Sequence, residues 1–586
     1  MYSHSGNCIP VTERPSALIP GAIMVILVAF AILLSFQLYV DNVFIVTTNG
    51  LWKSILVRKW ADNPDLVNLD LANLFYYPAY GQLIRLLDAL GVFAGLTWKQ
   101  MVVLNAAFAA IILGCIYYWI SSIFKSRLIG LLTVLFYLGS GHFLMLSVIN
   151  EDIMPSYFFV IVAMMLASVW FGAATAPRII AVALIVSIGW LFEWRLLFPV
   201  VPPMLLALWV SSRDWKQSFA WCLEFILGLC ILPLIITIGV AILSNLNFAA
   251  ATSFFGRLFW VGKGIGTGWA GFSLTKLHLT WVGIAESLIG GRCIQSADWI
   301  NYLANIWEVF AGTLLVLLLA GVSIFYVWQR RRDAFTLTHF IIFGGTFIGG
   351  EVFNLYSQPQ DPQMQLTVMP WIIPAWGVLM TLWLAPGNRI LQIVPSTFNN
   401  GLIPVISAFA FSLFPMANTV PVIAGYRGGN TQYLEVLTRL EQKFDSSKTV
   451  FLYLGFDALI PWQFANWSAT WPDVDHLPPA PASNPKFKWI SITDGMINYP
   501  GWTPQQQATE LRRKIDLALS LGYRIVTNSL WLFPEKKWTE ITGTISRPET
   551  PLAIRRMLLQ TYHADEVFVD PVEGSFFEIK LLDKKL

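Results

Sequence analysis

The chain has 586 residues, of which 56% are hydrophobic and only 12% are charged, and its mean hydropathy is +0.60. Soluble domains carry roughly 25% charged residues, so this composition excludes an ordinary soluble protein and predicts a polytopic membrane protein. The net charge is only +3, with the basic residues spread over short loops, which excludes a nucleic-acid-binding surface. The five cysteines have no metal-ligand spacing.

Apolar segments recur along the chain as far as residue 424. A spanning helix needs about 20 apolar residues, and about eleven segments reach or approach that length. They lie near 17–40, 101–124, 128–149, 155–175, 179–193, 196–210, 218–243, 306–328, 336–356, 366–385 and 402–424. The expected fold is therefore an α-helical membrane domain over residues 1–424. The two short segments on either side of 193–195 also fit a single bent pair.

The basic residues of short loops prefer the cytoplasm. Arg14, Arg178 and the run 330–332 all fall on one side of the predicted membrane. We therefore expect an inner (plasma) membrane protein with a cytoplasmic N-terminus. The outer loops 41–100 and 244–305, together with the C-terminal tail, then face away from the cytoplasm.

Carboxylates stand at two helix ends on that outer side. Asp41 directly follows the first apolar segment, and Asn150, Glu151 and Asp152 follow the third. A charge that faces lipid costs several kcal/mol, so these acids either mark where helices leave the bilayer or form a shared site. Because they lie on the same side, we expect the carboxylates to approach one another in a site.

Cations are also predicted on the outer side. Glu193 and Arg195 lie between two short apolar segments, where an ionisable residue is a functional candidate. Arg195 is the first choice to bind an anionic group, unless it only forms an internal ion pair with Glu193. The outer loop adds Arg257, Lys263 and Arg292 among tryptophans and glycines, whose spacing is not that of a phosphate loop.

A late outer loop at 357–365 is rich in amides. It holds Gln358, Asp361 and Gln363 between prolines. Amide groups suit hydrogen bonding to sugar hydroxyls, although a tight turn bounded by prolines explains the same residues.

The composition changes after about residue 425. Strands are expected at 448–454, 523–527, 566–570 and 576–581, and helices at 505–521 and 552–562. The segment 425–586 is therefore predicted to be an extracytoplasmic α/β domain. Its polar residues have no catalytic spacing, so we expect it to support the membrane domain or to dock an acceptor.

These features resemble the GT-C superfamily of membrane glycosyltransferases, which use polyprenyl-phosphate-linked sugars and include protein O-mannosyltransferases and aminoarabinose transferases. The matching features are Asp41 after the first span, helices in the long first outer loop, the stretch 150–152 after the third span, and the loop 357–365. The resemblance is architectural and covers residues 17–424. Asn42 follows Asp41 where the superfamily often has a second acid.

The resemblance implies an inverting glycosyltransferase that moves a sugar from a polyprenyl-phosphate carrier to a glycan, lipid or protein acceptor. It assigns the general base to Asp41, and binding of metal or substrate to Glu151 and Asp152. A divalent ion, Mg²⁺ or Mn²⁺, is the expected cofactor. The departing phosphate needs positive charge, which the outer-face cations are expected to supply.

Three other classes fit parts of the pattern. A transporter or lipid-carrier flippase usually has ionisable residues near the bilayer midplane and often has paired repeats, neither of which this sequence displays. A polysaccharide polymerase or ligase would rely on outer-loop arginines more than on Asp41. A non-enzymatic scaffold would use its outer domain to bind a partner.

Overall fold

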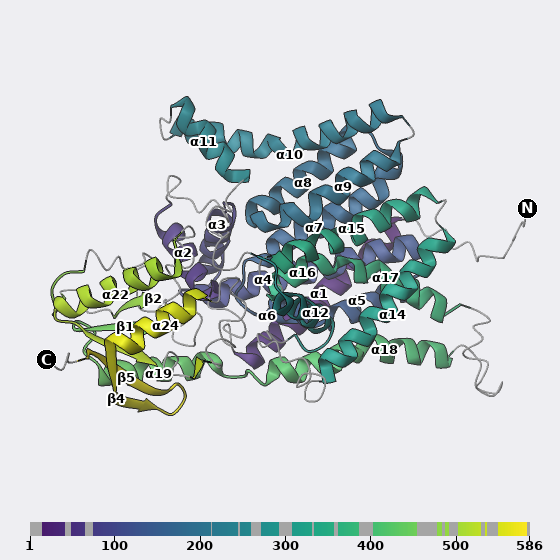
Figure 1. Ribbon diagram of the computed structural model, residues 1–586. Helices are drawn as coiled ribbons and strands as arrows, with labels where there is room; N and C mark the ends of the chain where they lie inside the picture. Colours follow the sequence, from purple (N-terminus) through teal and green to yellow (C-terminus); the bar gives the residue numbers. More distant parts are fainter. Residues whose placement is uncertain are drawn as a thin grey trace, which may run out of the picture.

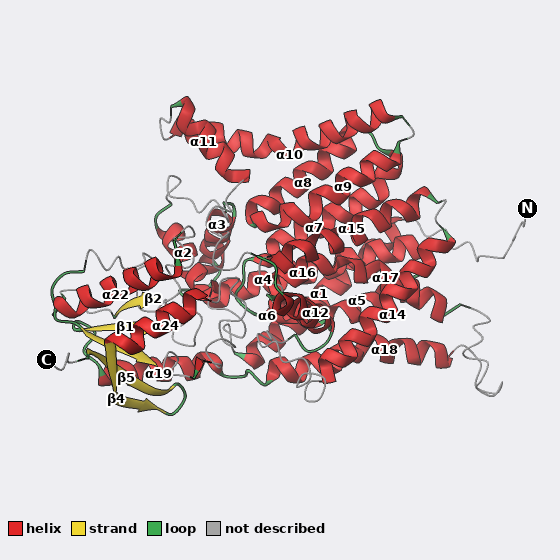
Figure 2. Ribbon diagram, viewed as in Figure 1, coloured by secondary structure: helices red, strands yellow, loops and turns green. Residues whose placement is uncertain are grey.

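The computed structural model describes residues 15–41, 49–64, 74–212, 214–243, 247–259, 271–291, 307–330, 333–356, 361–385, 402–453, 477–482, 487–491, 502–528, 534–535 and 549–582. Long helices form most of the molecule, and a smaller α/β region lies at the left in Figure 1. Among the described residues, the strands lie in that C-terminal region (Figure 2).

Nine helices among the described residues are long and apolar enough to cross a membrane. A bent pair, α5 with α6, adds a tenth span, and α8 is a shorter apolar helix of 17 residues. The α-helices of this part of the chain, spanning and shorter ones together, are α1 (Ile19–Val40), α4 (Thr97–Phe124), α5 (Arg127–Leu138), α6 (Gly141–Val148), α7 (Ile153–Trp170), α8 (Ala176–Phe192), α9 (Leu197–Ser211), α10 (Trp215–Leu243), α11 (Phe248–Phe259), α12 (Leu274–Leu288), α14 (Trp307–Gln329), α15 (Ala334–Tyr356), α16 (Pro362–Val368), α17 (Ile372–Trp383) and α18 (Leu402–Ala424).

The expected helical membrane domain is confirmed, since each predicted apolar segment contains a helix. Full-length spans are fewer than the predicted eleven because the third segment is broken and α8 is short. Short 3-10 turns, η1 (Pro15–Leu18), η3 (Phe171–Ala173), η4 (Trp194–Leu196) and η6 (Met369–Trp371), adjoin α1, α7, α9 and α17.

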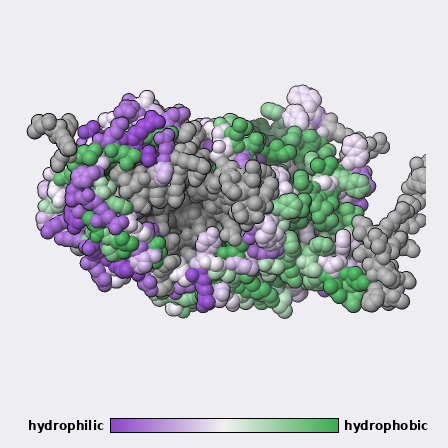
Figure 3. Space-filling view, turned by 60° about the horizontal axis from the view of Figure 1, so that its bottom comes forward, coloured by the Kyte–Doolittle hydropathy of each residue, from purple (hydrophilic) through white to green (hydrophobic). Residues whose placement is uncertain are grey.

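The long helices present apolar side chains on the outside of the molecule. Leu227, Ile235 and Ile242 of α10 are 58%, 58% and 70% exposed. Hydrophobic residues cover the helical part at the right in Figure 3, whereas hydrophilic residues gather on the C-terminal region at the left. Exposed aliphatic side chains on long helices suit contact with lipid.

The chain bends by 69° between α5 and α6. Glycines are needed there because neighbouring backbone comes close. A Cβ on Gly139 would lie 2.5 Å from the Met416 amide nitrogen, and one on Gly141 would lie 2.1 Å from the Glu286 carbonyl oxygen. All eight residues of α6 are buried. The short helix therefore ends inside the protein and brings the residues that follow it into the interior.

The segment between α1 and α4, which the sequence predicts to be the first outer loop, contains the helices expected there. They are α2 (Asn49–Asp62) and α3 (Tyr76–Ala89), which pack against each other and against α4. Arg58 of α2 joins them, since its Nη1 donates to Asp88 at 2.8 Å and its Nε donates to Thr97 Oγ1 at 2.7 Å. The hydrogen bond from Arg58 lowers the pKa of Asp88 to about 2.

A five-stranded sheet with the order β2-β1-β3-β5-β4 organises the C-terminal region. β2, β1 and β3 are parallel, and β5 runs antiparallel to both of its neighbours. The elements are α19 (Gly429–Lys443), β1 (Thr449–Tyr453), β2 (Lys488–Ser491), α22 (Pro504–Ser520), β3 (Arg524–Asn528), α24 (Glu549–Thr561), β4 (Tyr562–Asp570) and β5 (Gly574–Leu581). The α/β character expected for this region is confirmed, and the sequence patterns missed β2 and α19.

Alternate residues of β1 face opposite sides of this sheet, as the period of a strand requires. Val450 and Leu452 pack into a core with residues of α22 and α24. Phe451 instead contacts Phe444 and Phe576, with ring centroids 5.8 Å and 6.4 Å away. Both faces of β1 are therefore covered.

Replacing Gly141 with alanine is expected to destabilise the protein by about 1–3 kcal/mol. The added methyl group would overlap backbone atoms of α12, which cannot move aside as a side chain can. Gly172→Ala is a matched control, since a Cβ at Gly172 meets nothing within 4 Å. Thermal unfolding of the detergent-solubilised variants measures the difference. Equal unfolding temperatures for the two variants would contradict the close approach of α6 and α12.

Candidate functional site

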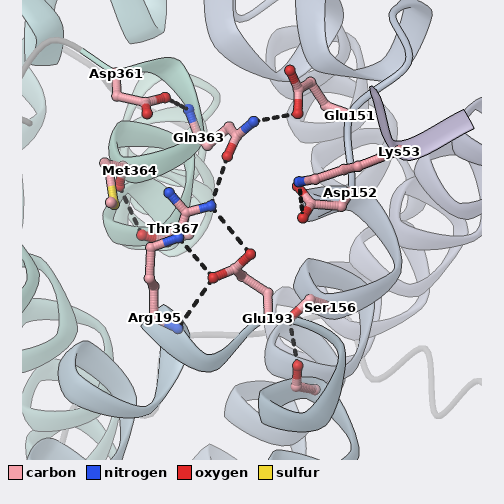
Figure 4. A network of polar contacts seen from close by, with 11 residues as sticks. Lys53, Glu151, Asp152, Ser156, Glu193, Arg195, Asp361, Gln363, Met364 and Thr367 are labelled. Carbon is pink, nitrogen blue, oxygen red and sulfur yellow. Dashed lines mark hydrogen bonds and ion pairs between the residues drawn. The ribbon is translucent and has the colours of Figure 1, made fainter. Parts of the chain in front are cut away.

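Four parts of the chain that are distant in sequence meet inside the protein (Figure 4). They are α2, the residues between α6 and α7, the η4 turn before α9, and the start of α16. All four were predicted from the sequence to lie on the outer side of the membrane. Their side chains form a buried polar network of carboxyl, amide and cationic groups.

Gln363 lies at the centre of this network. Its Nε2 donates to Glu151 Oε2, and its Oε1 accepts from Arg195 Nη2 at 2.9 Å. Asp361 caps the helix that carries Gln363, because its Oδ1 accepts from the Gln363 amide at 2.9 Å. One side chain therefore links a carboxyl group and a guanidinium group that come from distant segments of the chain.

Arg195 is also bound by Glu193. Its Nε donates to Oε1 at 2.6 Å and its Nη2 donates to Oε2 at 3.1 Å, a two-point pairing of the kind that suits arginine. Glu193 is 1% exposed. The internal ion pair considered from the sequence is thus present, and it directs the guanidinium into the network through Gln363.

Lys53 and Asp152 form a second ion pair, in which both side chains are buried. Burial by itself would raise the pKa of Asp152, but Lys53 and then Arg195 outweigh it and hold the pKa below its ordinary value. Burial would lower the pKa of Lys53, but the nearby carboxyl groups, Asp152 first among them, together outweigh burial and raise it. Both groups therefore stay charged at neutral pH.

Glu151 behaves differently from its neighbour. Burial raises its pKa to about 8, with Lys53 acting in the opposite direction. Its main chain is fixed by Asn105, whose Nδ2 donates to the Glu151 carbonyl at 2.6 Å and whose Oδ1 accepts from the Tyr80 hydroxyl at 2.6 Å. Glu151 therefore holds a proton at neutral pH. It lies between the ion pairs Lys53–Asp152 and Arg195–Glu193, each of which has no net charge.

The predicted metal ligands, Glu151 and Asp152, have other contacts. Among the residues that the structure describes, no group of three or more His, Cys, Asp and Glu side chains is arranged to hold a metal ion. Lys53 supplies the positive charge beside Asp152. A divalent ion stays a prediction from the sequence, and the chemistry proposed for this site does not depend on it.

Asp41 ends α1 in a left-handed conformation with φ of 42°. The preceding carbonyl, of Val40, accepts from the Gly428 amide at 2.9 Å, so the connection to the C-terminal region runs beside Asp41. The network of Figure 4 is made by other residues. The approach of Asp41 to Glu151 and Asp152 stays a prediction.

Four further candidates cannot be placed in the site. Lys263, Arg292 and Gln358 lie outside the described residues, and for Arg257 only the backbone position on α11 is described. Their predicted contacts with an anionic group or a sugar stay predictions.

The sequence patterns missed two residues of the site, Lys53 and Asn105. Lys53 lies in a stretch of mixed polarity within the first outer loop, where nothing marks it as different from Lys59. Asn105 did leave a signal, because it is an amide inside the apolar segment 101–124, and buried polar groups need hydrogen-bond partners.

No protein-family model matches the sequence, and no curated protein matches it. Among solved structures, those of ArnT from Cupriavidus metallidurans, in the apo state and bound to undecaprenyl phosphate, are similar with TM-scores of 0.52 and 0.51. The sequence identity is 13% in both comparisons, which cover 97% and 96% of this chain and 98% of the ArnT chain. At this identity the likeness establishes the fold. The architecture expected from the GT-C resemblance is thereby confirmed.

Replacing Lys53 with methionine is expected to lower the free energy of unfolding by about 3–5 kcal/mol, because it leaves the Asp152 carboxylate buried without its cation. The double variant Lys53→Met/Asp152→Asn should recover part of the loss, since no unpaired charge remains. Lys59→Met is the control, because Lys59 is an exposed residue of the same helix. Thermal unfolding in detergent measures all three, and a Lys53→Met protein as stable as the control would argue against the ion pair.

Proposed function

We propose that this protein is an integral membrane glycosyltransferase that transfers a sugar from a polyprenyl-phosphate carrier to an acceptor on the extracytoplasmic face. The observation that carries the proposal is a buried network of two cations and several carboxyl groups within a fold like that of ArnT, one of whose structures is bound to undecaprenyl phosphate. Buried ionisable groups in a membrane protein are expensive and usually functional.

Arg195 and Lys53 are proposed to bind the carrier phosphate. Both are cations held in place by carboxylates on one side, Arg195 by Glu193 and Lys53 by Asp152. Such preorganised donors stabilise the charge that develops on a departing phosphate without having to rearrange during the reaction. In this proposal Glu193 and Asp152 position the cations, and Gln363 connects Arg195 to Glu151.

The protonation of Glu151 determines whether an anion is accepted. With Glu151 neutral, the pairs Lys53–Asp152 and Arg195–Glu193 balance, and an incoming phosphate meets no excess negative charge from these five residues. With Glu151 ionised, the phosphate would meet a like charge in a partly apolar interior, where such repulsion is weakly screened. The raised pKa of Glu151 therefore favours donor binding at neutral pH.

Asp41 is proposed as the general base, as the resemblance implies. An acceptor hydroxyl attacks the anomeric carbon and gives its proton to the Asp41 carboxylate, while the bond between that carbon and the phosphate oxygen breaks and the electron pair leaves with the lipid phosphate. A single displacement of this kind inverts the anomeric configuration. The sugar and the acceptor are left open by the residues of the site.

The proposal is tested with purified protein in liposomes that contain undecaprenyl-phosphate-linked sugars, by measuring release of undecaprenyl phosphate and formation of a glycosylated product. Asp41→Asn is expected to lower turnover by about 10²–10⁴-fold, the usual contribution of a general base, while donor binding survives. Arg195→Ala is expected to weaken undecaprenyl phosphate binding by roughly 10- to 100-fold, the equivalent of about 1.5–3 kcal/mol for a hydrogen bond to a charged group.

Undecaprenol, which lacks the phosphate, is the matched ligand control and should bind equally to the wild type and to Arg195→Ala. Normal turnover in Asp41→Asn would remove Asp41 as the base. If the wild-type protein moves the lipid across the bilayer and transfers no sugar from any carrier, the flippase class considered from the sequence replaces the transferase.

The pH dependence of donor binding tests the role of Glu151. Its pKa is raised to about 8, so the neutral form predominates below that pH and is lost as the pH rises through it. Affinity for undecaprenyl phosphate should therefore fall above about pH 8 in the wild type. Glu151→Gln keeps a neutral group and should remove this alkaline loss while binding normally at neutral pH. The same alkaline loss in Glu151→Gln would assign the titration to another group.

A further inference from the structure

A third glutamate, Glu351, lies within the apolar spanning helix α15 and outside the network described above. Its carboxyl group is away from solvent, and its Oε1 has no hydrogen-bond partner among the described residues. An ionisable residue inside a spanning helix is energetically costly, and such residues usually have a specific use. The hydrogen bond that it accepts from Gln365 points to such a use, because Gln365 lies on α16.

Two side chains of α15 bind α16 from the side. Gln365 Nε2 donates to Glu351 Oε2 at 3.3 Å, and Asn354 Nδ2 donates to the Met364 carbonyl at 3.2 Å. Gln365 and Asn354 are 0% and 1% exposed. Water does not reach these amide groups, so the contacts between the helices provide hydrogen bonds that buried amides need. α15 thus binds both a side chain and the main chain of α16.

The two helices are also in close steric contact. A Cβ on Gly350 would lie 2.0 Å from Val368 Cγ1, so α15 reaches the end of α16 without an intervening side chain. α15 is itself packed on α9, where Phe198 and Phe353 stack with ring centroids 5.3 Å apart. Since α9 begins two residues after Arg195, α15 connects the helix that follows Arg195 to the helix that carries Gln363.

α16 depends on such contacts for its position. It is the seven-residue first part of the span Pro362–Trp383, and the 3-10 turn η6 separates it from α17, so contacts with neighbouring helices help to fix its orientation. Gln363 and Gln365 are two positions apart, about 200° around the helix axis, so they point to opposite sides. Gln363 faces Glu151 and Arg195, whereas Gln365 faces Glu351.

We propose that Glu351 is a positioning residue, which holds α16 through Gln365 so that Gln363 on the opposite side keeps Arg195 in place for the carrier phosphate. The role in phosphate binding rests on the proposed function, whereas the fixing of α16 does not. Glu351 touches no reacting group. It acts on the site by fixing the orientation of α16, the short helix that carries both Gln365 and Gln363.

The test compares Glu351→Leu with Glu351→Gln, which keeps an oxygen that accepts from Gln365. Glu224→Leu is the matched control, because Glu224 is an intramembrane glutamate on α10, a helix that packs on α8 and α9. Two quantities are measured on the folded fraction of each variant in detergent: hydrogen–deuterium exchange of the peptide that contains residues 361–369, and affinity for undecaprenyl phosphate. Loss of folded protein alone changes neither quantity.

Glu351→Leu is expected to speed exchange in this peptide and to weaken undecaprenyl phosphate binding several-fold, while Glu351→Gln and Glu224→Leu stay close to the wild type. Unchanged exchange in Glu351→Leu would overturn the proposal. Faster exchange with unchanged affinity would overturn the link between α16 and the phosphate site. If the wild type itself binds no undecaprenyl phosphate, the proposed function fails, and the exchange data still decide whether Glu351 fixes α16.

Discussion

The energetic cost of burying charge governs the arrangement of the interior around α6 and α16. Lys53, Asp152, Glu193 and Arg195 are all held inside a largely apolar helical bundle, where an unpaired ion would cost several kcal/mol. They occur as two ion pairs, and burial raises the pKa of the neighbouring Glu151 carboxyl to about 8, so that it retains a proton at neutral pH. Amide groups complete the network because they donate and accept without adding net charge.

Such a network needs helices that end inside the protein. A continuous span exposes its ends to the two membrane surfaces, whereas α6 is about two turns long and ends inside the protein, and α16 starts the span Pro362–Trp383 from a buried position. Their ends place Glu151 and Gln363 in the interior, and the free backbone groups beside them are bonded by Asn105 and Asp361. Irregular backbone at this depth is tolerated where it is covered by protein, as it is here.

The segment between α1 and α4 completes the site from outside the bundle. Without α2, Asp152 would lack the Lys53 cation, and α2 is itself fixed to α3 and α4 by Arg58. The C-terminal region joins the bundle at the end of α1, where the Arg427 guanidinium lies 4.4 Å from the Tyr39 ring centroid. The segment between α1 and α4 and the C-terminal region therefore join the helical domain by separate contacts.

The sequence by itself determined the membrane class, the position of each apolar helix and the α/β character of the C-terminal region, because these follow from local composition and from the period of the hydrophobic pattern. It also identified Glu151, Asp152, Glu193, Arg195 and Gln363 as candidates, because polar residues at the ends of apolar segments are visible without any knowledge of packing. Tertiary structure alone decided which of them meet. Lys53 pairs with a carboxylate 99 positions away, and Gln363 bonds to Glu151 across 212 positions, so the partners share no local pattern. The break between α5 and α6, and the contact of Glu351 with α16, likewise depend on close approach between helices, which a one-dimensional pattern does not contain.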